Sequence, residues 1–185
     1  MFFRPLNTLL ILALPTVGLA AFDPPKNNVE TQQIAMSEDL TSQVVLVLQN
    51  GSNECRAVPA VYQIDCYRQT FRRAGSTVSR YPDYNDAGKA LRNVEKTLKA
   101  VLKQYPDKAT PPLRNNGRTY KPIQPDAVKP AAAAFERART EATTILLRAR
   151  GPLKIHYERI AAVVGSNKLI IRSQLLKQML LKRLT

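Results

Sequence analysis

The chain of 185 residues contains a single histidine, His156, which is the first residue to examine for catalytic chemistry. A catalytic histidine needs a nucleophile or a carboxylate beside it, and no recognisable motif surrounds His156. The residue falls on the apolar face of a predicted helix, which is typical of a hydrogen-bonded histidine in a protein core. The sequence also lacks the motifs of nucleophile elbows, zinc proteases and phosphate-binding loops. These observations favour a protein that is not an enzyme.

Metal chemistry is not indicated by the sequence either. Two cysteines and one histidine are too few for a self-contained zinc site, and no Glu precedes His156 by the three residues that a di-iron bundle requires. Glu136, Glu141 and Glu158 each have arginines nearby, which predicts surface ion pairs. We therefore expect no cofactor, no metal and no catalytic residue. The enzymatic alternative is a carboxylate site, or a site around His156, that forms only in the folded chain.

The two cysteines, Cys55 and Cys66, are expected to form a disulfide, since paired cysteines are typical of exported proteins. On one continuous helix their separation would be about 16 Å, which is beyond the reach of a disulfide. Pro59 suits the first turn of a helix, so we expect Cys55 in the loop before that helix, folded back beside Cys66. A redox pair is the competing interpretation, and the spacing is not C-x-x-C.

Residues 1–21 have the features of a secretory signal peptide. Arg4 provides the positive start, residues 6–14 the apolar core, and residues 18–21 a small-residue cleavage site. Pro15 ends the apolar run early, which favours cleavage over a permanent anchor. We expect an exported protein, periplasmic or secreted and bacterial in origin; an uncleaved anchor is the alternative.

Residues 148–185 combine apolar and basic side chains. This stretch carries nine Lys and Arg against one acid, which accounts for +8 of the formal net charge of +14. Two helices are expected, 152–164 and 167–184. A helix that is apolar on two sides usually lies inside a bundle, whereas a basic amphipathic helix binds an anionic membrane surface or a partner helix. The residues that we expect at an anion-binding or partner-binding surface are Arg148, Arg150, Lys154, Arg159, Lys168, Arg172, Lys177, Lys182 and Arg183.

Nucleic acid is a less favoured partner. Arginines alternate with aromatic residues between positions 56 and 81, and arginine binds phosphate while aromatic rings stack on bases. The predicted export, and a helical setting that buries some of the aromatic rings, argue against this use. The residues concerned are Arg56, Arg68, Arg72, Arg73 and Arg80, with Tyr62, Tyr67, Phe71 and Tyr81.

The remaining pattern predicts an all-α bundle of five to six helices in a single domain, residues 37–185, after a loose leader at 22–36. Residues 40–49 also have strand character, and we prefer a helix because no convincing partner strand follows. Asp83 is expected to cap the third helix, and the prolines of 106–130 predict a long extended loop without regular structure. The helices are expected at 37–49, ended by Asn50-Gly51; at 59–74, broken by Gly75-Ser76; at 84–105; at 130–149; and in the two C-terminal segments.

These expectations combine into an exported, non-enzymatic helical protein. It would bind an anionic lipid, an envelope polysaccharide or a protein partner through its basic C-terminal helices. A homo-oligomeric assembly protein that associates through Ile171, Leu175 and Met179 is one alternative. A nucleic-acid-binding protein and an enzyme with an unrecognised site are the others.

Overall fold

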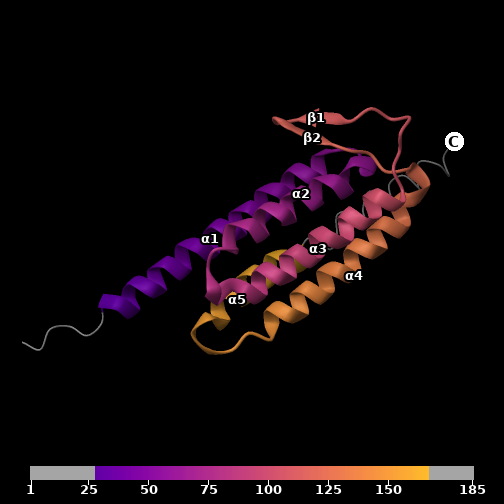
Figure 1. The fold of residues 1–185 in the computed structure, drawn as a ribbon. Helices are drawn as coiled ribbons and strands as arrows, with labels where there is room; N and C mark the ends of the chain where they lie inside the picture. The colour runs from indigo at the N-terminus through magenta and orange to yellow at the C-terminus, as the bar shows by residue number, and fades with distance from the viewer. Residues whose placement is uncertain (1–27, 167–185) are drawn as a thin grey trace, which may run out of the picture.

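The computed structural model describes residues 28–166 as a bundle of five α-helices with one small β-hairpin, which confirms the predicted all-α bundle (Figure 1). The helices connect through short turns except between α3 and α4, where the proline-rich segment intervenes. The elements are α1 (Asn28–Ala57), α2 (Ala60–Val78), α3 (Asn85–Gln104), β1 (Leu113–Asn115), β2 (Arg118–Tyr120), α4 (Val128–Leu147) and α5 (Lys154–Ser166).

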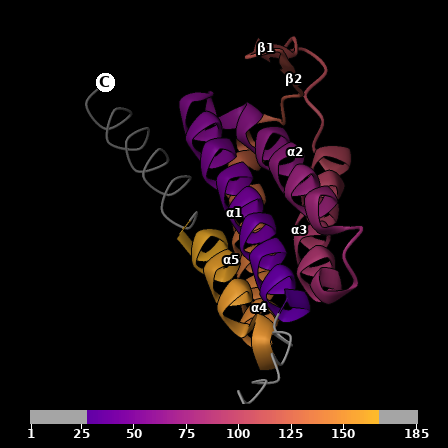
Figure 2. The same ribbon diagram turned by 90° about the vertical axis from the view of Figure 1, so that its left-hand side faces the viewer.

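Each helix packs on the next in sequence, and α5 also packs on α1, so the five helices enclose one core. Figure 2 shows α1 with α5 on one side and α2 on the other. Helices joined by short turns pack as antiparallel neighbours, and their apolar stripes meet inside. The buried stripe of α3 is the one predicted from its spacing and includes Ala87, Leu91, Val94, Leu98 and Val101.

Helix α1 differs from the prediction at both ends. It begins at Asn28, so the predicted leader is wrong for residues 28–36, and it continues through Gly51 to Ala57. Gly51 permits close contact between α1 and α2: a Cβ at this position would lie 2.3 Å from the Thr70 side chain. The glycine thus serves helix packing instead of ending the helix. The strand alternative for residues 40–49 is wrong.

Helix α2 also extends further than predicted. Gly75 lies inside it, where a Cβ would approach Arg92 Cγ of α3 to 3.2 Å, so this glycine too marks a close helix contact. The predicted disulfide is present, with the Cα atoms of Cys55 and Cys66 5.5 Å apart. However, Cys55 lies in the last turns of α1 and not in a loop. The helices reverse direction at Pro59, which brings the two cysteines together.

The proline-rich segment contains a β-hairpin, so the prediction of a long loop without regular structure is wrong. Strands β1 and β2 form an antiparallel hairpin whose turn places Asn116 and Gly117 at φ values of 47° and 71°. Asn-Gly tolerates this left-handed conformation, which two-residue hairpin turns require. The hairpin is tied to α2 because Asp65 Oδ2 accepts a hydrogen bond of 2.8 Å from the backbone nitrogen of Lys121.

The other helices lie within about two residues of their predicted bounds. Helix α3 follows a 3-10 turn, Pro82–Tyr84, and its N-cap position is occupied by Tyr84 instead of the predicted Asp83, which lies within that turn. Two further 3-10 turns, Pro125–Ala127 and Gly151–Leu153, lead into α4 and α5. The helix predicted at 167–184 lies outside the described residues.

Candidate functional site

A chain of hydrogen bonds surrounds His156 in the core. The hydroxyl of Tyr84 donates to the carbonyl oxygen of Ser37 over 2.8 Å and lies 2.7 Å from Thr41 Oγ1. Because the Tyr84 proton is used in that bond, Thr41 donates to Tyr84 and accepts from His156 Nδ1, 3.1 Å away. This chain of donors joins α1, the turn before α3, and α5.

The surroundings of His156 differ from those of a histidine in a catalytic triad. Thr41 and Tyr84 are buried, so a substrate cannot reach their hydroxyls. Glu38 Oε2 lies 3.8 Å from Nδ1, the same ring nitrogen that faces Thr41. A catalytic triad instead places its carboxylate and its hydroxyl on opposite nitrogens. The prediction of a hydrogen-bonded core histidine is confirmed.

Two of the three glutamates considered as candidate catalytic groups form ion pairs. Glu136 binds Arg139 at 2.6 Å, and Glu158 binds Lys154 at 3.6 Å. Glu141 is exposed on α4. Within residues 28–166, no group of three or more His, Cys, Asp or Glu side chains is placed to hold a metal ion.

Arg139 is a buried residue that sequence reasoning missed. Its side chain is 2% exposed, and Nη1 donates to the carbonyl oxygens of Val164 and Gly165 at the end of α5. Carbonyl oxygens in the last turn of a helix commonly need a donor from outside the helix, and a cation also matches the negative end of the helix dipole. The sequence held one sign of this burial: Arg139 directly follows Ala138 of the predicted apolar stripe.

A second cluster attaches the hairpin to α1. Glu54 accepts hydrogen bonds from Arg118 and from the hydroxyl of Tyr120, which is 2.5 Å away. Burial, followed by the neighbouring Glu54 carboxylate, raises the pKa of Tyr120 to about 12. These contacts hold the hairpin against the end of α1.

At one end of the bundle, two turns meet around a surface hollow. The α2–α3 turn and the α4–α5 turn meet there, because the hydroxyl of Tyr157 donates to the backbone carbonyl of Asp83 over 2.8 Å. Between the two turns lies a hollow of about 480 Å³. It is lined by Asp83, Asp86, Ile145, Arg148, Ala149, Arg150, Leu153 and Tyr157.

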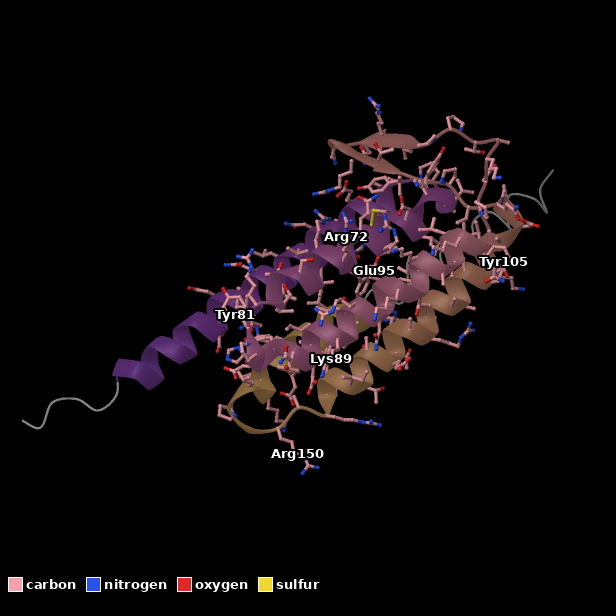
Figure 3. All side chains as sticks on the ribbon, viewed as in Figure 1. Arg72, Tyr81, Lys89, Glu95, Tyr105 and Arg150 are labelled. Carbon is pink, nitrogen blue, oxygen red and sulfur yellow. A yellow bond between two sulfur atoms is a disulfide. The ribbon has the colours of Figure 1, made fainter. Side chains whose placement is uncertain are left out.

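This end exposes apolar side chains together with cations. Four large apolar side chains are exposed within the described residues, and three of them are here: Tyr81 (39%), Leu147 (55%) and Ile155 (62%). The fourth, Leu46, lies midway along α1. Figure 3 shows Tyr81 beside the α2–α3 turn and Arg150 pointing away from the bundle beyond the α4–α5 turn. We call this set the tip surface: Arg80, Tyr81, Leu147, Arg148, Arg150, Lys154 and Ile155, all exposed.

The structure divides the nine predicted binding residues into separate groups. Arg148, Arg150 and Lys154 lie on the tip surface, although Lys154 is also paired with Glu158. Arg159 instead binds Glu38 of α1. Helix α5 leads away from the tip over its 13 residues, which span about 20 Å. Lys168, Arg172, Lys177, Lys182 and Arg183 lie outside the described residues, as do Ile171, Leu175 and Met179.

The aromatic residues considered for nucleic-acid stacking do not form an exposed platform. Tyr62, Tyr67 and Phe71 are buried, and Tyr67 stacks on Phe135 of α4 with ring centroids 4.8 Å apart. Tyr81 alone of the four is exposed.

No helix within residues 28–166 is both long and apolar enough to cross a membrane. Comparison with protein-family models, curated proteins and solved structures gives no match to this chain.

Proposed function

We propose that the protein docks on an anionic membrane surface through its tip surface. The observation that carries the proposal is the gathering of three of the four exposed large apolar side chains among exposed arginines at one end of the bundle. Exposed apolar patches with a polar rim are typical of interaction sites. A mixture of apolar and basic side chains suits the membrane interface, where apolar groups enter the acyl boundary and cations meet phosphate.

Each kind of residue on the tip surface has a role at such an interface. Leu147 and Ile155 are about half exposed, so each contributes about 1 kcal/mol on entering the lipid. Tyr81 suits the headgroup level, where tyrosine rings are enriched. A lysine or arginine near an anionic leaflet contributes about 1 kcal/mol.

The affinity expected from these groups is modest. Two apolar side chains and four cations contribute at most about 6 kcal/mol before the costs of association. That amount predicts weak, reversible binding. The signal peptide predicted at 1–21 would bring the protein to the cell envelope. The proposal is thus a peripheral, non-enzymatic binding function.

Co-sedimentation with vesicles tests the proposal. The protein is mixed with vesicles of phosphatidylcholine alone, or with about a third of phosphatidylglycerol, over a series of salt concentrations. We expect binding to the anionic vesicles only, weakening as salt screens the charges. A Leu147→Gln, Ile155→Gln double variant should bind several-fold more weakly, because both changed side chains are exposed and the fold is preserved.

Leu46→Gln is the matched control, since Leu46 is 54% exposed but lies away from the tip. The control should bind like the wild type. Arg148→Gln with Arg150→Gln should reduce the preference for anionic lipid. Equal binding by the wild type and the Leu147, Ile155 variant would reject the tip surface as the contact, and no binding at any salt would reject the membrane.

A further inference from the structure

A line of five cations runs along the outer face of α3, away from the tip surface. The residues are spaced alternately three and four positions apart, which places them within an arc of about 80° on a helix of 3.6 residues per turn. Their span of 14 positions corresponds to about 21 Å. We call this line the α3 stripe: Lys89, Arg92, Lys96, Lys99 and Lys103.

Few acids neutralise the α3 stripe. Lys89 pairs with Asp86 at 3.4 Å, and both side chains are largely exposed. Glu95, on the flank toward α2, is directed to Arg68 of α2 at 3.7 Å and is mostly covered. Among the described residues, no ion pair involves Arg92 or the three lysines that follow it in the stripe. The face therefore carries uncompensated positive charge over most of its length.

The side chain of Arg92 packs in the space left by two glycines. A Cβ on Gly88 of the same helix would lie 3.0 Å from Nη1 of Arg92, and a Cβ on Gly75 of α2 would lie 3.2 Å from its Cγ. The side chain thus lies flat over the α2–α3 contact and is half-buried. A guanidinium positioned in this way loses little conformational freedom when it binds an anion. In Figure 3, Arg72 of α2 and Glu95 of α3 lie at the contact between these two helices, and Lys89 lies nearer the start of α3.

We propose that the α3 stripe binds an extended chain of an anionic polysaccharide. The stripe is linear, and its cations follow one another about every 5 Å along the helix axis, close to the length of one sugar unit. Its outer face has no aromatic side chain between Lys89 and Lys103 on which the bases of a single-stranded nucleic acid would stack. The predicted export also favours an envelope polysaccharide over a nucleic acid.

This binding is separate from the proposed membrane contact. The stripe follows the length of α3, whereas the tip surface covers one end of the bundle. A molecule bound to a membrane through its tip surface would therefore leave the α3 stripe free for the polysaccharide. The two surfaces together would connect a membrane to a polymer beside it.

The test uses heparin and polygalacturonate as probes, with a duplex DNA of similar charge as the comparison. The stripe variant carries Lys96→Gln, Lys99→Gln and Lys103→Gln, and the matched control carries Arg114→Gln, Lys121→Gln and Lys129→Gln. All six residues are exposed, and no ion pair is described for any of them, so both variants lose the same charge without disturbing the fold.

Fluorescence anisotropy with labelled probes, over a salt series, gives the affinities. The wild type should bind both polysaccharides with strong salt dependence, the stripe variant about tenfold more weakly, and the control within about twofold of the wild type. The Leu147→Gln, Ile155→Gln variant should bind them normally. Equal losses in stripe and control variants would overturn the proposal, because net charge alone would then explain the binding. Tighter binding of DNA than of polysaccharide would also overturn it, as would no binding at low salt.

Discussion

The hydroxyl of Tyr157 on α5 donates a hydrogen bond of 2.8 Å to the backbone carbonyl of Asp83, in the turn between α2 and α3. The Tyr157 ring also stacks on Tyr84, with centroids 5.8 Å apart. These contacts join two turns that lie far apart in the sequence. They hold together the end of the bundle that carries the tip surface.

Replacing Tyr157 with Phe should lower the free energy of unfolding by about 1 kcal/mol, because the Asp83 carbonyl loses its donor while the ring packing remains. Urea unfolding followed by circular dichroism measures this change. Amide exchange in the α2–α3 turn should also become faster. Unchanged stability together with unchanged exchange would show that the bond does not hold the turns.

Replacing Arg139 with Met should destabilise the protein by about 1–3 kcal/mol, because carbonyl oxygens at the end of α5 lose their donor. The substitution removes the Nη1 donor that the carbonyl oxygens of Val164 and Gly165 share. Arg137→Met is the control, because Arg137 is exposed on the same helix. Thermal unfolding of the two variants gives the comparison, and equal effects would mean that the burial of Arg139 contributes nothing.

Removing the disulfide with Cys55→Ala and Cys66→Ala should lower the free energy of unfolding by about 3 kcal/mol, through the greater freedom of the unfolded chain. Adding a reductant to the wild type should shift its denaturation midpoint toward that of the variant. A denaturation midpoint that does not respond to the variant or to the reductant would contradict the expected contribution.

Alkaline pH should destabilise the protein partly through Tyr120. Burial raises its pKa from about 10 to about 12, so the folded protein retains a proton that the unfolded chain releases. The stability from this group is present in full below about pH 10 and is lost as the pH rises to about 12. Urea unfolding at pH 9 and pH 11 should show this loss, and Tyr120→Phe should reduce it. A phenol absorbance titration in which every tyrosine ionises near pH 10 would contradict the raised pKa.

The sequence by itself determined the fold class, most helix positions and the disulfide. Apolar residues at steps of three and four, such as Leu91, Val94 and Leu98, can be buried together only on a helix, so α3 was predicted within one residue at each end. Only two cysteines were available to pair. The position of His156 on an apolar face likewise predicted its place in the core.

Tertiary structure decided how the helices pack and which residues gather on a surface. Gly51 and Gly75 resemble helix breakers in the sequence, but each lies inside a helix because a neighbouring helix fills the space of the missing Cβ. Arg139 resembles a surface residue, yet the end of α5 encloses it. Arg148 and Arg159 belong to one basic stretch of the sequence, but the first lies at the tip and the second binds Glu38 of α1. Such relationships depend on contacts between distant segments, and local periodicity carries no information about them.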